Sequence, residues 1–288
     1  MSERLRIAVQ KGGRLGTKSL ELVESAGFRI LRGANELLYR IENAPIDLLC
    51  VRDDDIPTFV DDGVADFGIV GRNVLEERGA GELTEVMPLG FGRCTLKIAA
   101  PAGWPYRGVQ SLQGARIATT YPRTLARFLE RNGVEAEIVT MRGAVEVAPR
   151  LKLAQVICDL VSTGATLEAN GLVAVDTVMN SEAVLIRGAS KINAALAHVA
   201  ASVVQRFRGV AASQGSKYVM MNAPRSALPE ISRILPGAGA PTVTPLAGND
   251  DAVAVHAVCQ ESVFWETLEK LRGAGASAIL VLPIEKMM

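Results

Sequence analysis

Two patterns of apolar and polar residues alternate along roughly the first 160 residues of the chain. Short apolar runs, each closed by glycine, proline or a charged residue, are typical of buried strands, whereas longer stretches with spaced apolar positions are typical of helices. The expected strands lie at 5–9, 46–51, 66–71, 96–100, 116–120, 137–139 and 157–159, and the expected helices at about 17–26, after 56, from 73 and at 124–132. Because the two kinds of element alternate, the pattern predicts an α/β fold with mainly parallel sheets.

The pattern changes after about residue 210. Strands are expected at 217–221, 242–246, 252–258 and 278–282, and helices at 225–235 and 262–272. The resulting order, β-α-β-β-α-β, is that of a small ferredoxin-like domain. Since this region carries no recognisable catalytic constellation, it suits regulation or assembly better than catalysis. Simple structural packing is the alternative.

The stretch 157–168 carries the clearest chemical signal. A short apolar run reaches an acid and is followed by hydroxyls around one glycine: Asp159, Ser162, Thr163, Gly164 and Thr166. Here a strand is expected to lead into a tight loop and then into the start of a helix. Such a junction presents free backbone N–H groups and the positive end of the helix dipole, which suit a phosphate. The glycine permits close approach or positive φ. The acid, placed at the strand end, would hold sugar hydroxyls, because a carboxylate repels phosphate.

This stretch is not a Walker A loop, since the lysine and the glycine spacing are absent. An ordinary helix cap and turn is the plain alternative. The combination of acid, hydroxyls, glycine and helix favours a loop that holds the 5-phosphate and ribose of a phosphoribosyl donor.

A second strand-to-helix turn, at 10–16, is rich in glycine and basic. Lys11 and Arg14 are suited to pyrophosphate or nucleotide phosphates. The spacing is not that of a Rossmann fingerprint, and a plain turn is the alternative. Ligands in α/β folds bind at the carboxyl ends of strands. Residues expected near that edge are Lys11, Arg52, Asn73, Thr120 and Asp159.

Composition narrows the function classes. Lys+Arg and Asp+Glu both number 31, so the net charge of zero argues against a nucleic-acid footprint. No signal peptide or membrane span is expected. Four cysteines without a C-x-x-C motif indicate buried thiols in a reducing cytoplasm, and two histidines exclude a histidine-rich metal site. The acids at 53–55 precede Pro57, which favours a helix start over metal chelation.

Motifs spread over essentially all 288 residues resemble those of the ATP phosphoribosyltransferase family, in its long, self-regulated form. They lie at 51–57, 143–149, 159–167, 216–218 and 279–286. The resemblance implies a transferase of the first step of histidine biosynthesis. It would join N1 of ATP to C1 of 5-phosphoribosyl 1-pyrophosphate, with Mg²⁺, and release pyrophosphate. Histidine and AMP would inhibit it, and it would form dimers and hexamers in the cytoplasm.

The resemblance also implies an architecture. The catalytic part would be bilobed, like type II periplasmic binding proteins, with lobes at 1–93 plus 184–210 and at 94–183. Residues 211–288 would form an ACT-like histidine sensor. A solute-binding protein of the same fold, and a different phosphoribosyl-utilising transferase, remain as competing classes.

Site residues follow from the resemblance by position. Asp159 would hold the ribose hydroxyls, and with Lys11 and Arg52 it would form the catalytic set. The 5-phosphate cradle would comprise Ser162, Thr163, Gly164, Ala165, Thr166 and Leu167. The nucleotide or ribose region would comprise Lys11, Gly12, Arg14, Arg52, Asn73, Tyr121 and Glu146. Histidine would contact Asn222, Thr242 and Ala276. No residue is assigned as a general base, and Asn73 stands where some family members carry Asp.

Overall fold

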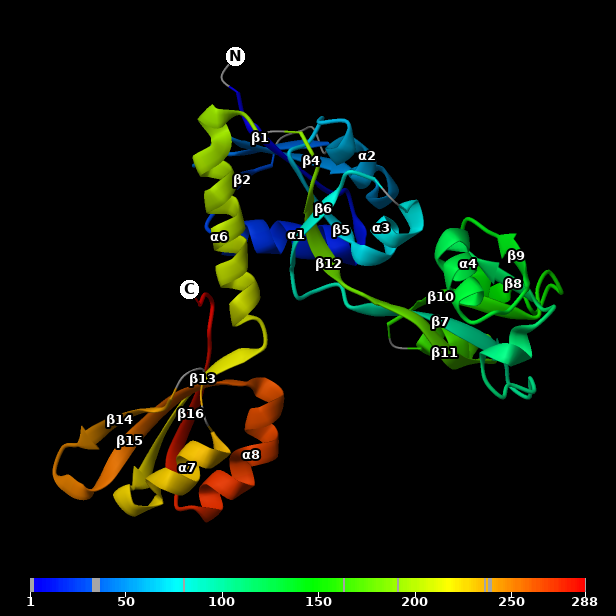
Figure 1. Cartoon of the computed structure of the whole chain (residues 1–288). Coiled ribbons are helices and arrows are strands. Elements are labelled where there is room, and N and C mark those ends of the chain that lie inside the picture. The colour runs from blue at the N-terminus through cyan, green and yellow to red at the C-terminus, as the bar shows by residue number, and fades with distance from the viewer. Residues whose placement is uncertain are drawn as a thin grey trace. The chain divides into compact units, whose positions relative to one another are not determined.

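A computed structural model describes residues 3–32, 37–79, 81–162, 164–190, 192–235, 237 and 240–287. The chain divides into two compact units, Met1–Val204 and Gln205–Met288. Figure 1 shows the helices and strands of both, and each unit is described by itself below.

The first unit contains a seven-stranded sheet with its own helices, which we call lobe I. The strand order is β2-β3-β4-β1-β5-β12-β6. The strands are β1 (Leu5–Gln10), β2 (Ile30–Leu31), β3 (Leu38–Ile41), β4 (Ile46–Val51), β5 (Phe67–Gly71), β6 (Thr84–Pro88) and β12 (Ala183–Arg187). The helices are α1 (Gly13–Ser25), α2 (Ile56–Asp61) and α3 (Arg72–Arg78). The central strand β5 is buried throughout, and β1 is buried at Leu5 and from Ile7 to Val9, as expected for strands covered by helices on both sides.

A five-stranded sheet, which we call lobe II, has the order β11-β7-β10-β8-β9. Its strands are β7 (Cys94–Pro101), β8 (Arg116–Thr119), β9 (Glu137–Thr140), β10 (Val156–Val161) and β11 (Leu172–Ser181), and its helices are α4 (Pro122–Arg131) and α5 (Ala165–Ala169). The chain passes between the lobes twice, from β6 to β7 and from β11 to β12. Backbone hydrogen bonds join these passages, from Leu89 N–H to the Ala183 carbonyl (2.9 Å) and from Ala183 N–H to the Phe91 carbonyl (2.8 Å).

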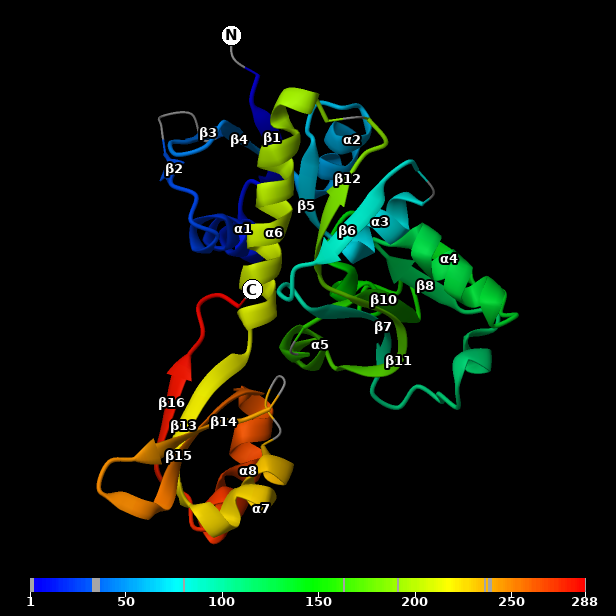
Figure 2. The ribbon, with the colours of Figure 1, turned by 60° about the vertical axis from the view of Figure 1, so that its left-hand side comes forward.

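Helix α6 (Ala197–Ser213) leads into the second unit. This unit is a four-stranded antiparallel sheet of order β14-β15-β13-β16, and Figure 2 shows both of its other helices on one side of the sheet. The elements are β13 (Ser216–Pro224), α7 (Leu228–Ile234), β14 (Thr242–Leu246), β15 (Asn249–Gln260), α8 (Glu261–Gly273) and β16 (Ser277–Pro283). The core between sheet and helices includes Val219, Met221, Val255 and Leu271, all fully buried.

The predicted α/β class and the β-α-β-β-α-β order of the C-terminal part are confirmed. The prediction of mainly parallel sheets is wrong. In lobe I only β1 pairs in parallel, with β4 and β5, and in lobe II only β8 does, with β9 and β10. The remaining described pairs of these two sheets are antiparallel: β3 runs against both β2 and β4, β12 runs against β5 and β6, and β7 runs against β10 and β11.

The predicted start of the first helix is also wrong. Helix α1 begins at Gly13 rather than at Thr17, so most of the expected turn is helical. Gly16 lies inside this helix, and a Cβ there would come within 2.4 Å of the Gln10 carbonyl oxygen. Only glycine lets α1 start so close to the end of β1. None of the helices in the described part of the chain combines the length and the apolar character needed to cross a lipid bilayer.

Candidate active site

A cavity of about 810 Å³ lies between lobes I and II. Its described lining residues come from the start of α1, the start of α3, the passage into β7, the N-terminus of α4 and the end of β10. The charged residues among them are Arg14, Lys18 and Arg93 against Asp53. The volume suits a small-molecule ligand, and the excess of positive charge favours an anionic one.

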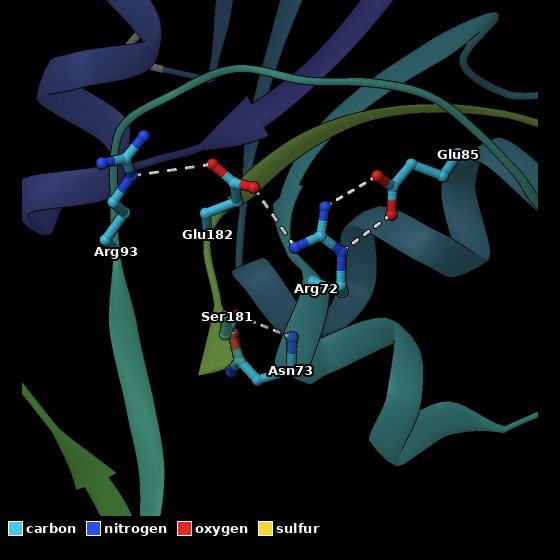
Figure 3. A network of polar contacts seen from close by, with 6 residues as sticks. All are labelled: Arg72, Asn73, Glu85, Arg93, Ser181 and Glu182. Atoms are coloured by element: carbon cyan, nitrogen blue, oxygen red, sulfur yellow. Dashed lines mark hydrogen bonds and ion pairs between the residues drawn. The ribbon is translucent and has the colours of Figure 1, made fainter. Parts of the chain in front are cut away.

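A hydrogen-bond network at this cavity joins the two lobes. Buried Asn73, in the first turn of α3, donates from Nδ2 to the Tyr121 Oη (3.0 Å). Ser181, at the end of β11, donates from Oγ to the Asn73 Oδ1 (2.8 Å) and accepts the Asn73 backbone N–H (3.0 Å). Figure 3 shows Asn73 beside Ser181. Because the Tyr121 oxygen accepts from Asn73, its own proton is available to donate.

Burial raises the pKa of Tyr121, and the charges of Asp159 and Asp53 raise it further against the opposing effect of the Asn73 hydrogen bond. Tyr121 therefore acts as a neutral phenol at physiological pH. The charges that act on Tyr121, at the start of α4, thus come from Asp159 of β10 and from Asp53, which follows β4.

Asp159 lies within β10, opposite Lys97 of β7. The prediction that it ends its strand is wrong, because β10 continues to Val161 through pairing with β7. Burial raises its pKa, the Leu160 N–H that it accepts (2.8 Å) lowers it, and the charge of Glu146 raises it again. Asp159 and Glu146, from the 3₁₀ turn Val145–Val147, thus form one acidic group.

The loop after β10 has the predicted backbone form where it is described. Gly164 has φ +83° and precedes α5, so the predicted positive φ is confirmed. Ser162 lines the cavity, and Ala165 and Thr166 are exposed in the first turn of α5. The Leu167 side chain packs in the core of lobe II, so only its backbone is free for a ligand. Thr163 lies outside the described residues.

The loop after β1 runs directly into α1. Lys11 is exposed and donates its backbone N–H to the Val51 carbonyl (2.7 Å), which brings the ends of β1 and β4 together. Gly12 has φ −156°, an extended form open to any residue. Arg52 is exposed and precedes the 3₁₀ turn Asp53–Asp55. Asp55 occupies the N-cap position of α2, but its carboxylate makes no capping hydrogen bond.

The structure brings some of the predicted residues to the cavity and leaves others beside it. Arg14, Asn73, Tyr121 and Ser162 line it. Three other predicted residues are not among the described lining residues, although a sequence neighbour of each is. Gly13 lines the cavity next to Gly12, Asp53 next to Arg52, and Leu160 next to Asp159.

The three predicted effector residues lie on different parts of the second unit. Asn222 of β13 pairs with Ser277, next to Ala276, whereas Thr242 lies on the edge strand β14 and pairs with His256. The Ala276 side chain is buried in the core, and its N–H donates to the Leu271 carbonyl (3.0 Å).

Three residues at or next to the cavity were not predicted: Arg93 and Cys94, which line it, and Ser181, which hydrogen-bonds to Asn73 and lines an adjoining pocket with both of them. They belong to the passages between the lobes and to the end of β11, which the apolar pattern does not mark. No local signal distinguishes them, since their roles come from contacts with residues far away in the sequence.

The described residues include no group of three or more His, Cys, Asp or Glu side chains arranged to hold a metal ion.

Comparison with known proteins identifies the family. A family model described as ATP phosphoribosyltransferase matches residues 52–209, and a model of the HisG C-terminal domain matches residues 213–286. The chain belongs to the ATP phosphoribosyltransferase family. It is a pentosyltransferase of the first step of histidine biosynthesis, and this family uses ATP and 5-phosphoribosyl 1-pyrophosphate.

Individual relatives agree with this assignment. The chain is 54% identical to an ATP phosphoribosyltransferase of Maricaulis maris, over 100% of both sequences. It is 27% identical to a chain of the solved ATP phosphoribosyl transferase (HisG:HisZ) complex from Thermotoga maritima, with a TM-score of 0.60, and the match covers 71% of this chain and 98% of that one. Its likeness to the periplasmic aliphatic sulphonate binding protein SsuA from Escherichia coli is weaker, at 18% identity and a TM-score of 0.47 over 74% of this chain and 75% of that one.

Proposed function

We propose that the cavity between lobes I and II joins N1 of ATP to C1 of 5-phosphoribosyl 1-pyrophosphate, giving N1-(5-phosphoribosyl)-ATP and pyrophosphate. One observation carries the proposal. Arg14, from the helix start after β1, and Ser162, from the loop after β10, line the same cavity. Two strand-to-helix junctions, each suited to phosphate, thus contribute to one site for two phosphorylated substrates.

The loop after β10 is the proposed donor half. Asp159 accepts hydrogen bonds from the ribose hydroxyls, and residues 162–167 hold the 5-phosphate through backbone N–H groups and hydroxyls. The positive φ of Gly164 and the exposure of Ser162 and Thr166 support this assignment. The acidic pair of Asp159 and Glu146 keeps phosphate away from the hydroxyl-binding side.

The opposite wall is the proposed nucleotide half. Lys11, Gly12, Arg14 and Arg52 follow β1 and β4 and offset phosphate charge, while Asn73, Tyr121 and Glu146 line the adenosine or ribose region. The cationic lining and the Asn73–Tyr121 hydrogen bond support this arrangement.

The reaction needs no general base, because the lone pair of adenine N1 attacks the anomeric carbon directly. The residues orient the two substrates and stabilise the oxocarbenium-like centre and the departing pyrophosphate. Asp159, as a carboxylate, favours positive charge on the ribose. Lys11 and Arg52 favour negative charge on the leaving group. When bound to the pyrophosphate, Mg²⁺ supplies further neutralisation of that charge. We assign no protein ligand to it.

The second unit is the proposed regulatory domain. We propose that residues 211–288 sense histidine through the region of Asn222, Thr242 and Ala276, and that residues 1–93 with 184–210 and residues 94–183 are the two catalytic lobes. The three separate sheets support this division. Inhibition by AMP, a dimer–hexamer equilibrium and a cytoplasmic location complete the proposal.

One incubation tests the catalytic part. The purified chain with ATP, donor and Mg²⁺ should form a product with the mass of phosphoribosyl-ATP, together with pyrophosphate. Omitting either substrate should abolish both signals. Binding of ligands without any product would favour the solute-binding alternative, and phosphoribosylation of a different acceptor would favour a different transferase.

A further inference from the structure

Helix α4 lacks a cap of its own. Its N-cap residue is Tyr121, whose side chain makes no capping hydrogen bond, and Pro122 has no N–H. The free donors at this end are therefore the N–H groups of Arg123 and Thr124. Left open beside a cationic cavity, they would form an anion site.

A carboxylate from lobe I fills this position. The Glu77 Oε1 accepts the Arg123 N–H (2.9 Å), and its Oε2 accepts the Thr124 N–H (2.9 Å) and the Thr124 hydroxyl (2.8 Å). Glu77 belongs to α3, more than 45 positions earlier in the chain. A negative charge at a helix N-terminus is stabilising, and hydrogen bonds to an ionised acceptor are the stronger kind.

Further contacts run between the same two helices. The Arg123 guanidinium donates to the Arg78 carbonyl (2.7 Å), and the Arg127 guanidinium donates to the Glu76 carbonyl and approaches its carboxylate (3.3 Å). The C-terminal carbonyls of α3 thus receive positive charge while the N-terminus of α4 receives negative charge.

The spacing links this contact to the cavity. Asn73 and Glu77 are four positions apart and therefore lie on one face of α3, while Tyr121 is the N-cap residue of α4, three positions before Thr124. The Asn73–Tyr121 hydrogen bond at the cavity and the Glu77–Thr124 hydrogen bond outside it are therefore neighbouring contacts between α3 and the start of α4.

We propose that Glu77 is a positioning residue for the reaction. It fastens α4 of lobe II to α3 of lobe I, and it thereby holds the Tyr121 hydroxyl against Asn73 where the nucleotide binds. By filling the N-terminus of α4, it also leaves the loops after β1 and β10 as the phosphate sites. The inference rests on the proposed function, in which Asn73 and Tyr121 contact the nucleotide.

Steady-state kinetics of the full chain test the proposal with Glu77→Gln, which keeps the shape and removes the charge and one acceptor. The KM for ATP should rise about five- to tenfold, while the KM for the donor stays within about twofold. The matched control is Glu76→Gln, whose side chain, within the described part of the chain, accepts from Arg127 and from no amide of α4. It should leave both constants unchanged.

Amide hydrogen exchange of the peptide that covers the start of α4 is a readout independent of turnover. Glu77→Gln should speed exchange there and Glu76→Gln should not. Faster exchange with both KM values unchanged would make the contact merely structural and overturn the proposal, as would unchanged exchange. If the wild type formed no phosphoribosyl-ATP, the proposed function would fall. Direct ATP-binding titrations of wild type and Glu77→Gln would then decide the positioning role.

Discussion

At the scale of single residues, Asp159 is proposed to bind the donor at a cost in the stability of the fold. Burial and the charge of Glu146 raise its pKa above the ordinary value of 3.8. Between that value and the raised one, the folded state binds more protons than the unfolded state, so the free energy of unfolding falls as pH rises through this window. Above the raised pKa, the ionised carboxylate is a net cost to the fold, which its proposed binding of the ribose would explain.

Asp159→Asn should therefore separate the two effects. At neutral pH we expect turnover to fall by about a hundredfold or more, since the amide no longer offers two charged acceptors to the donor. The thermal midpoint at neutral pH should be equal or higher, and the difference from the wild type should vanish below the ordinary pKa. Activity and thermal unfolding across pH measure both. The exposed Asp62→Asn is the control, and near-normal turnover of Asp159→Asn at low donor concentration would refute the donor assignment.

Gly164 is a second residue of the proposed donor site, and its backbone conformation is unusual. Its φ of +83° is costly for any residue with a Cβ, although no atom lies within 4 Å of the position that a Cβ would take. Gly164→Ala should lower the free energy of unfolding by about 1–2 kcal/mol through backbone strain alone. It should also raise the KM of the donor.

Gly12→Ala is the matched control for stability. Gly12 also has open space around it but is extended, with φ −156°, so alanine should be neutral or slightly stabilising. Denaturant unfolding of both variants measures the difference. Equal effects would show that the positive φ does not matter at residue 164.

Residue patterns predicted candidate site residues only where the suspected chemistry is local. Asp159, Ser162 and Gly164 stand next to one another in the sequence, and so do Lys11, Gly12 and Arg14. Ser181 and Glu77 escaped notice because their partners lie 108 and 47 positions away, so that no neighbouring residue hints at their role.

At the scale of elements, α3 is tied to β6 and to the passage from β11 to β12. The Arg72 guanidinium donates twice to Glu85 of β6 (3.0 and 2.8 Å) and once to Glu182 (3.4 Å), as Figure 3 shows. Glu182 also approaches Arg93 of the other passage at 3.9 Å. Hydrogen bonding to Glu85 raises the pKa of Arg72, against its partial burial.

Arg72→Lys should weaken this junction. Lysine cannot form the paired hydrogen bonds to Glu85, so we expect a loss of about 1–2 kcal/mol in the free energy of unfolding. Arg93→Lys is the control, because the Arg93 side chain is 79% exposed and its ion pair is long. It should change stability by less than about 0.5 kcal/mol. Denaturant unfolding measures the stability of both variants. Equal effects would show that the paired hydrogen bonds of Arg72 do not stabilise this junction.

Element prediction succeeded for strands that are mostly apolar, such as 46–51, in which Asp47 is the one charged residue and whose bounds match those of β4. It missed β11, in which only the first and last of ten residues, Leu172 and Ser181, are buried and whose pairing is interrupted by two register shifts. It also placed the start of α1 too late, since glycines at 12, 13 and 16 read as a turn. The tight approach of Gly16 to Gln10 is a tertiary contact that local propensity does not contain.

At the scale of the whole molecule, the change of pattern near residue 210 predicted a separate C-terminal part, because a β-α-β-β-α-β order closes one sheet with its own core. The fold class of that part followed from the pattern alone. The position of an effector did not, since Asn222, Thr242 and Ala276 are neither adjacent in the sequence nor gathered at one point of the sheet.

The proposed regulation by the second unit can be tested by removing that unit. A chain ending at residue 213, which keeps α6 whole, should still form phosphoribosyl-ATP, because every described residue that lines the 810 Å³ cavity lies before residue 163. Histidine should no longer inhibit it, since the proposed sensor sheet is removed. In the full chain, Asn222→Ala should weaken inhibition severalfold, while Thr244→Ala, exposed on the same sheet, should not. Inhibition curves against histidine measure all three variants. A shortened chain that stayed as sensitive as the wild type would place the sensor in the first unit and leave the C-terminal sheet with an assembly role.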